Sequence, residues 1–187
     1  IIAQYAGAVA YMDACIQSIF NALSSHGILD ETIIIFNGDH GETLYEHECW
    51  FDHHGIYENT LHVPLIIHAP FLKTQPGVAE GLVQNLDIFA TVLDLAGLAL
   101  PEKCISRSLL PMLNNPRSTI RDAAFAESFD RKMIRQGRYK LIVENDPLGT
   151  ELYDIQQDPG ETTNLARDPS TPQAATSDPQ RLAAMNG

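Results

Sequence analysis

Side chains capable of acid–base or metal chemistry follow directly on an apolar run. The stretch IIIFNGDHGE, residues 33–42, passes from four apolar side chains to three ionisable ones, with Asp39 and His40 adjacent. A carboxylate and an imidazole at adjacent positions can bind one cation if the backbone turns sharply, and Gly38 and Gly41 permit such a turn. Asp39 and His40 are therefore candidate metal ligands. The alternative is structural: the carboxylate caps a turn and the imidazole occupies a hydrogen-bonded pocket.

A second cluster, FDHHG, places His53 and His54 side by side about a dozen residues further on. Adjacent histidines before a glycine are compatible with a metal ligand, a proton donor or an anion-binding cation. They are also compatible with structural histidines in a polar loop. Residues 38–62 show no clean periodicity and hold five of the seven histidines. A long polar loop after a strand is more often functional than decorative.

The segments around these clusters predict an α/β sheet that would position them. Residues 3–25 repeat apolar side chains at steps of three and four, which predicts an amphipathic helix. The run 32–37 is short and apolar on both faces, so we expect a parallel strand covered on both sides, and 63–70 predicts a second apolar strand. Ligands of open α/β sheets bind at the carboxyl ends of the strands, where Asp39 and His40 would lie.

A further helix is predicted at residues 85–98, NLDIFATVLDLAGL, with Asn85 as its N-cap. Its apolar positions are expected in the core rather than in a site, and they are Leu86, Phe89, Val92, Leu93 and Leu95.

From about residue 121 the pattern becomes that of short strands. AAFAESF, KMIRQ, YKLIV and ELYDI predict an antiparallel meander, with turns at QGR and NDPLGT. We assign DPGE to a turn without chemistry. We therefore expect three regions: an α/β part at 1–120, a small antiparallel subdomain at 121–168 and a flexible tail at 169–187.

Composition limits the classes of partner. Acidic residues outnumber basic ones 24 to 12, and a formal charge of -12 argues against nucleic acid and anionic membranes. An anionic substrate would need a local cation such as a metal, although acidity also serves solubility alone. The three cysteines match neither a disulfide framework nor a zinc cluster, and no run is long enough to span a membrane. The chain begins inside a helical pattern without Met, so we expect a fragment.

Three stretches, ETIIIFNGDHGE, FDHHGIYENTLHVPLIIHAP and LYDIQQDPGETTNLA, resemble the C-terminal half of a sulfatase of the alkaline phosphatase superfamily. The resemblance covers roughly residues 1 to 166, and the order of several motifs makes it specific. It implies an α/β fold in which an alkaline-phosphatase-like mixed or parallel sheet is sandwiched by helices. Residues 1–120 would be part of that core, with the antiparallel subdomain packed beside it.

The resemblance also implies an activity and roles for residues. Sulfatases hydrolyse sulfate esters at a divalent cation, usually calcium, and the substrate here would be a small-molecule or glycan sulfate ester. Asp39 and His40 would be the late pair of metal ligands. His53 falls where many members have a lysine that contacts the sulfate and the leaving oxygen, and His54 is the second catalytic candidate. A cationic His53 could stabilise charge on the departing alcohol or donate a proton to it.

The family's nucleophile is a formylglycine made from the Cys or Ser of a C/S-x-P-x-R motif near the N-terminus, and no such motif occurs within residues 1–168 of this chain. KCISRS at Cys104 departs from the motif, because it has no proline and its arginine comes one position early. We therefore expect the nucleophile and the early Asp ligands in a missing N-terminal half, and no activity from this chain alone.

His40 leaves two alternatives open. Sulfatases often carry Asn at this position, whereas histidine occurs in phosphonate and phosphodiester hydrolases of the superfamily, where manganese or zinc suits an imidazole. The first alternative is such a hydrolase. The second is a non-catalytic relative that binds sulfated glycans.

Overall fold

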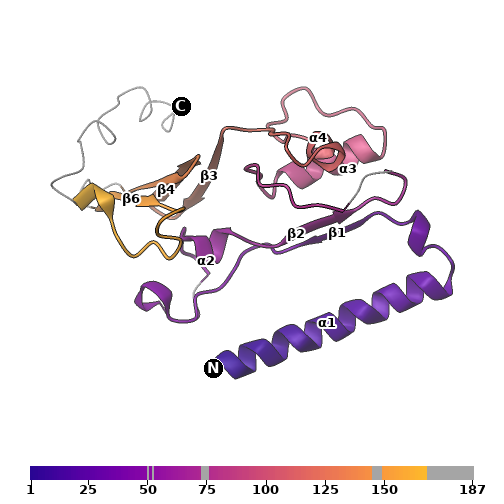
Figure 1. Cartoon of the computed structure of the whole chain (residues 1–187), viewed down its shortest axis with the longest axis horizontal. Coiled ribbons are helices and arrows are strands. Elements are labelled where there is room, and N and C mark those ends of the chain that lie inside the picture. Colours follow the sequence, from indigo (N-terminus) through magenta and orange to yellow (C-terminus); the bar gives the residue numbers. More distant parts are fainter. Residues whose placement is uncertain (50, 52, 73–75, 145–148, 168–187) are drawn as a thin grey trace. The chain divides into compact units, whose positions relative to one another are not determined.

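The fold is that of a computed structural model of the chain (Figure 1), which describes residues 1–49, 51, 53–72, 76–144 and 149–167. The expected tail at 169–187, and most of the expected turn NDPLGT, lie outside the described residues. The chain forms two compact units. Unit 1 comprises residues 1–53 and 59–121, and unit 2 comprises residues 54–58 together with the chain from Asp122.

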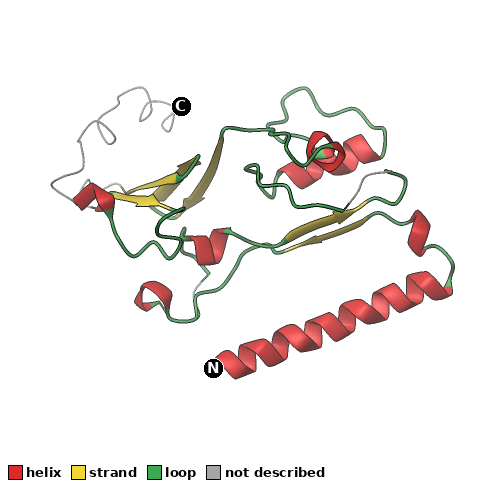
Figure 2. Ribbon diagram, in the orientation of Figure 1, coloured by secondary structure: helices red, strands yellow, loops and turns green. Residues whose placement is uncertain are grey.

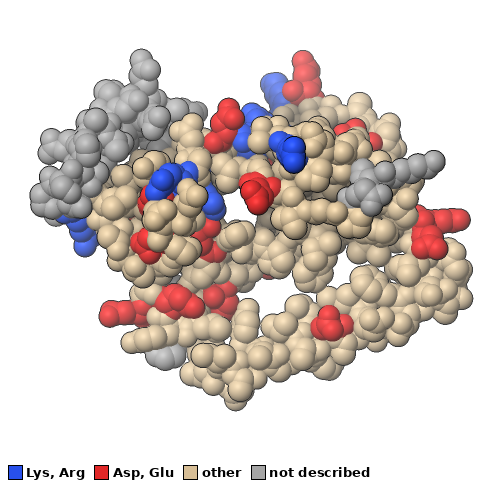
Figure 3. Space-filling view, in the orientation of Figure 1, with Lys and Arg blue, Asp and Glu red and all other residues tan. Residues whose placement is uncertain are grey.

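Unit 1 begins with α1 (Ile2–Ser25), which confirms the predicted amphipathic helix almost to the residue. Gly27, in the left-handed conformation at φ 69°, ends it. Asp13 is its one charged residue, and Figure 3 shows the helix almost entirely in tan. No residue of α1 is buried, and Ile19 on the apolar face is 59% exposed. A 3₁₀ turn, η1 (Leu29–Glu31), leads on to the first strand.

The two strands of unit 1 are β1 (Ile34–Asn37) and β2 (Leu65–His68), and they pair antiparallel. The expectation of a parallel strand covered on both faces was therefore wrong for β1, whose four residues are all half-buried. An apolar run reports a tendency to be buried and carries no information on strand direction. The direction of a strand depends on the segment that connects it to its neighbour. Here that segment contains η2 (Glu46–Glu48) and α2 (Glu58–Leu61), and it brings β2 back antiparallel beside β1.

The predicted helix at 85–98 is α3 (Asp87–Leu95), and it is followed by α4 (Leu110–Asn114). The buried residues of α3 are Asp87, Ala90 and Thr91. They do not belong to the apolar set that was expected in the core, and Phe89 of that set is 51% exposed. The polar side is buried because its groups are paired within unit 1. Thr91 Oγ1, for example, donates to the Asp87 carbonyl and accepts the Leu109 N–H.

Asn85 is not the N-cap of α3, because the helix begins two residues later and has no side-chain cap. Its amide donates instead to two backbone carbonyls in the loop after β1.

Unit 2 contains the predicted meander, which is confirmed (Figure 2). All neighbouring strands pair antiparallel in the order of the sequence, and they are β3 (Ala123–Ser128), β4 (Arg131–Gln136), β5 (Tyr139–Glu144) and β6 (Glu151–Asp154). Gly137, at φ 57°, forms the turn expected at QGR. A 3₁₀ turn, η4 (Leu165–Arg167), follows the sheet.

The buried apolar side chains of unit 2 come from three strands, the turn after β6 and the segment 54–58, and they are Ile56, Met133, Ile142, Leu152, Tyr153 and Ile155. In the described part of the chain, no helix combines the length and apolar character needed to cross a membrane.

Candidate functional site

The loop that leaves β1 lies against the segment that enters β2. The Gly38 N–H donates to the Pro64 carbonyl at 3.0 Å, and the Gly41 N–H donates to the Thr60 carbonyl at 2.8 Å. A Cβ at Gly41 would lie 1.9 Å from the Asn59 carbonyl oxygen, so only glycine permits this approach. Neither glycine has the positive φ of a left-handed turn. Gly41 therefore serves close backbone packing rather than the sharp turn expected from the sequence.

Asp39 and His40 extend from this loop with accessible side chains. The Asp39 side chain is 91% exposed and the His40 side chain 45%. The His40 backbone N–H donates to Asp39 Oδ1 at 2.9 Å. This hydrogen bond, followed by the charge interaction with the His40 ring, lowers the pKa of Asp39. The carboxylate is therefore ionised, which is the form that binds cations.

The His40 ring is held in one tautomer. Its Nδ1 lies 2.8 Å from the Gly41 carbonyl oxygen, and because a carbonyl only accepts, Nδ1 carries the hydrogen. Nε2 is therefore the ring nitrogen left to bind a cation, and it lies 3.8 Å from Asp39 Oδ2. Metal-binding histidines commonly donate their other ring N–H to a backbone carbonyl in this way. The Asp39–His40 pair thus presents an anionic oxygen and a basic nitrogen facing each other.

His53 comes to the same place from later in the chain. Its ring stacks on the His40 ring with centroids 4.5 Å apart and planes inclined by 15°. Its Nδ1 lies 3.8 Å from Glu42 Oε2. The other carboxylate oxygen of Glu42, Oε1, is buried without a hydrogen-bond partner among the described residues. The structure therefore brings Asp39, His40 and His53 together and adds Glu42.

No role was predicted for Glu42, although it lies in the same stretch as Asp39. Its only signal was its place two residues beyond His40, and the contact with His53 depends on long-range folding. Within the described residues, no three or more His, Cys, Asp or Glu side chains converge as a metal centre. Asp39 and His40 can therefore supply two ligands of a larger set.

His54, the second predicted catalytic residue, belongs to unit 2. Its carbonyl accepts a hydrogen bond from Ser128 Oγ at 2.5 Å. Its ring lies 5.5 Å from the ring of Phe129 in a tilted arrangement. These contacts attach His54 to the turn between β3 and β4, and a catalytic role for it stays a prediction.

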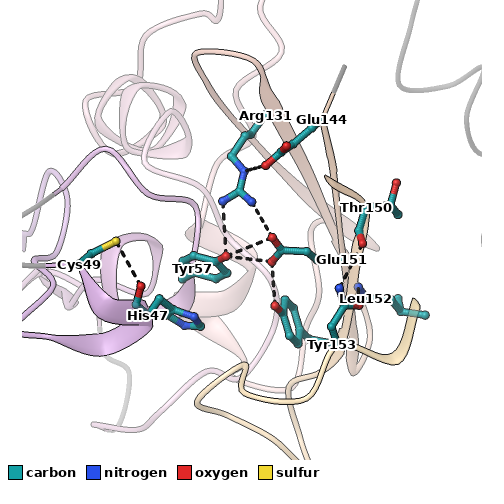
Figure 4. A network of polar contacts seen from close by, with 10 residues as sticks. His47, Cys49, Tyr57, Arg131, Glu144, Thr150, Glu151, Leu152 and Tyr153 are labelled. Atoms are coloured by element: carbon teal, nitrogen blue, oxygen red, sulfur yellow. Dashed lines mark hydrogen bonds and ion pairs between the residues drawn. The ribbon is translucent and has the colours of Figure 1, made fainter. Parts of the chain in front are cut away.

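Tyr57 anchors the same segment to the sheet through a polar network (Figure 4). Its hydroxyl donates to Glu151, with 2.9 Å to Oε2. Arg131 forms ion pairs of 2.5 Å with both Glu151 and Glu144, and Tyr153 donates to Glu151 at 2.7 Å. Burial is the main cause that raises the pKa of Tyr57 and of Tyr153, so both hydroxyls keep their hydrogens and serve as donors.

Glu58 provides a second anchor. It pairs with Arg135 at 2.7 Å and with the Lys140 ammonium at 3.2 Å. Lys140 is fully buried and also lies 2.7 Å from Glu161, a residue of the DPGE turn. Glu161 Oε2 in turn accepts the Glu58 N–H at 2.6 Å. The turn assigned no chemistry therefore carries a buried structural carboxylate.

The chain is similar to known proteins over most of its length. The sulfatase family model matches residues 1–98. The chain is 34% identical to choline-sulfatase of Rhizobium meliloti strain 1021 over 180 residues, which is 90% of the chain and 33% of that protein. It is 32% identical to arylsulfatase K of Mus musculus, covering 87% of the chain and 32% of that protein. The chain thus spans about a third of the length of these curated relatives.

Solved structures show the same likeness. BT4656 in complex with its substrate D-glucosamine-2-N,6-O-disulfate is 31% identical, with a TM-score of 0.84 over 95% of the chain and 38% of that structure. The phosphonate monoester hydrolase SpPMH from Silicibacter pomeroyi is 27% identical, with a TM-score of 0.79 over 93% of the chain and 38% of that structure. The alkaline-phosphatase-like α/β fold expected from the sequence is confirmed, and the chain represents part of it.

Proposed function

We propose that this chain, which belongs to the sulfatase family, provides metal ligands and a leaving-group residue to a sulfuric ester hydrolase. The observation that carries the proposal is the arrangement at the end of β1. The ionised Asp39 and the Nε2 lone pair of His40 face each other at 3.8 Å, and the His53 ring stacks against His40. The relatives matched are named as sulfatases, which supports this reaction over others.

The donor set at Asp39 and His40 suits a divalent metal ion. Asp39 offers a carboxylate with a lowered pKa, and the Gly41 carbonyl holds His40 in the tautomer that a metal requires. Calcium is the family's usual ion, but it prefers oxygen ligands, so the imidazole makes manganese or zinc the alternatives. Such an ion would polarise the sulfate group and help to ionise the nucleophile.

His53 acts on the leaving group in this proposal. The Nδ1 of its ring faces the Glu42 carboxylate at 3.8 Å, which orients the imidazole. A protonated His53 can hydrogen-bond to the ester oxygen and donate a proton as the bond to sulfur breaks. With His54 attached to unit 2 through Ser128 and Phe129, His53 is the stronger candidate of the two.

The nucleophile lies outside these 187 residues in our proposal, since the family's motif lies near the N-terminus, whereas the one C/S-x-P-x-R match in this chain, SDPQR at 177–181, follows the candidate metal pair near the C-terminus. The chain's coverage of about a third of its curated relatives is consistent with this. In the family, the modified residue of that motif is formylglycine. The substrate proposed is a sulfate ester of a small molecule or a glycan, because one relative is named choline-sulfatase and one structural neighbour holds a sulfated glucosamine.

A second candidate function is hydrolysis of phosphonate or phosphate esters. It is favoured by His40 and by the likeness to the phosphonate monoester hydrolase from Silicibacter pomeroyi. A non-catalytic relative that binds sulfated glycans is the third possibility, and it would keep the metal pair without turnover.

One experiment separates these functions in the full-length protein that carries this sequence. Hydrolysis of an aryl sulfate and of an aryl phosphonate is measured after chelation and after return of calcium, manganese or zinc. We expect metal-dependent hydrolysis that favours the sulfate. A preference for the phosphonate would replace the proposal by the second function. Metal-dependent stabilisation without turnover of either ester would replace it by the third.

A further inference from the structure

We infer that Asn85 is a positioning residue for the candidate metal pair, a role that rests on the proposed function. Its side-chain Nδ2 lies 3.1 Å from the Gly38 carbonyl oxygen and 3.1 Å from the Asp39 carbonyl oxygen. The amide group therefore donates both of its hydrogens to backbone carbonyls of the same loop. Because both acceptors are carbonyls, only the nitrogen of the amide can face them.

The two carbonyls matter because they set the peptide planes on either side of Asp39. The orientation of the Gly38 peptide and the Asp39 peptide fixes the backbone of Asp39 and hence the direction of its side chain. The Asp39 peptide also contains the His40 N–H, which donates to Asp39 Oδ1 at 2.9 Å. A clamp on these planes therefore orients both candidate ligands.

Asn85 is itself attached to a rigid base at the start of α3. The fully buried Asp87 accepts the Gln84 N–H and the Arg107 N–H, each at 2.9 Å. The Arg121 guanidinium pairs with Asp87 and also donates to Gln84 Oε1 at 2.8 Å. The backbone on both sides of Asn85 is thus fixed by a buried ion pair.

Asn85 is not needed for the helix or the core. It does not cap α3, and its side chain is exposed. Carbonyls at this exposed loop could instead be solvated by water at little cost to folding. Its two hydrogen bonds therefore bear on the geometry of the loop more than on the stability of unit 1. Removing a group that holds metal ligands in place typically changes metal affinity by about 10- to 100-fold.

The test uses Asn85→Asp in the full-length protein, since this change keeps the shape of the side chain but turns two acceptors toward two carbonyls. The matched control is Asn114→Asp, which adds the same charge at an exposed position at the end of α4. The metal-stripped proteins are titrated calorimetrically with Ca²⁺, Mn²⁺ and Zn²⁺ alone, and their melting temperatures without metal are compared. We expect Asn85→Asp to weaken metal binding by at least about tenfold with an unchanged metal-free melting temperature. The control should retain wild-type affinity.

Equal affinity of Asn85→Asp and wild type would overturn the inference while leaving the proposed function intact. Absence of metal binding by the wild type would overturn the proposed metal site and the inference with it. If Asn85→Asp fails to fold, Asn85→Ala decides between the same outcomes, because it removes both donors without adding a charge.

Discussion

At the scale of single residues, the candidate site depends on which atoms of Asp39 and His40 already take part in hydrogen bonds with the backbone. The His40 ring gives its Nδ1 hydrogen to the Gly41 carbonyl, and the His40 N–H goes to Asp39 Oδ1. One nitrogen lone pair and one carboxylate oxygen, Asp39 Oδ2, are left facing each other. The pair is therefore prepared for a cation before any cation arrives, which is the role proposed for it.

Replacing His40 by Asn tests the identity of the ligand atom. The change exchanges an imidazole nitrogen for an amide oxygen, which calcium prefers and which manganese and zinc favour less. We expect the ratio of calcium affinity to manganese affinity to rise by about tenfold, or about 1.4 kcal/mol. Calorimetric titration of the full-length protein measures both affinities. His68→Asn, on an exposed position of β2, is the control and should leave the ratio unchanged.

Replacing His53 by Gln tests its proposed action on the leaving group. Glutamine can still hydrogen-bond but cannot donate a proton to the departing oxygen. We expect turnover of aryl sulfates with poor leaving groups to fall by about 100-fold or more, and that of activated nitrophenyl sulfates to fall much less. The slope of log kcat against leaving-group pKa measures this. A uniform loss across all substrates would contradict the role, and His68→Gln should leave the slope as it is.

The sequence named candidate residues for the site, but it did not predict their contacts. Adjacency after an apolar strand was enough to single out Asp39 and His40, because neighbours in sequence remain neighbours in space. The stacking of His53 on His40 and the approach of Glu42 depend on how the loop folds back, which no spacing encodes. Asn85 was misassigned for a related reason: its residue type suits a helix cap, but its acceptors lie almost fifty positions away in the chain.

At the scale of elements, the prediction was good where the signal was local. Apolar side chains at steps of three and four predicted α1. Short strand-like runs separated by turns, one of them at Gly137, predicted the meander. The direction of β1 was wrong because strand pairing is a property of two segments. The apolar side of α3 was expected in the core, yet the chain buries Asp87 with its partner Arg121 there.

The buried ion cluster of unit 2 yields a stability prediction. Lys140 is fully buried between Glu58 and Glu161, so Lys140→Met would leave the buried Glu161 carboxylate without its cation and Glu58 with Arg135 alone. Breaking a buried pair in this way costs about 3 to 5 kcal/mol. Urea titration of the full-length protein measures the change in the free energy of unfolding.

Lys132→Met is the matched control on the neighbouring strand. Lys132 is half-buried and lies opposite Glu127 in the register of β3 and β4, so we expect a loss within about 1 kcal/mol. Equal losses in the two variants would show that the Lys140 cluster contributes no more than a surface charge.

At the scale of the whole molecule, the chain carries a formal charge of -12 and spans about a third of its curated relatives. An acidic protein repels a sulfate ester at long range, so attraction must come from local cations. Asp39 and His40 can hold one such cation, and a protonated His53 can be another. The described residues hold no cluster of three or more potential metal ligands, and in our proposal the nucleophile lies outside this chain.

The 187-residue chain on its own should therefore hydrolyse no aryl sulfate, with or without calcium, manganese or zinc. A two-ligand site holds a metal weakly, and the one C/S-x-P-x-R match, SDPQR at 177–181, lies near the C-terminus, whereas the family's nucleophile motif lies near the N-terminus. The assay is run beside the full-length protein at equal molar concentration, and folding of the chain is checked by circular dichroism. Metal-dependent turnover by the chain alone would show that the nucleophile lies within it. Ser177 would then be the first residue to replace, because SDPQR at 177–181 matches the motif, whereas KCISRS at Cys104 lacks the proline.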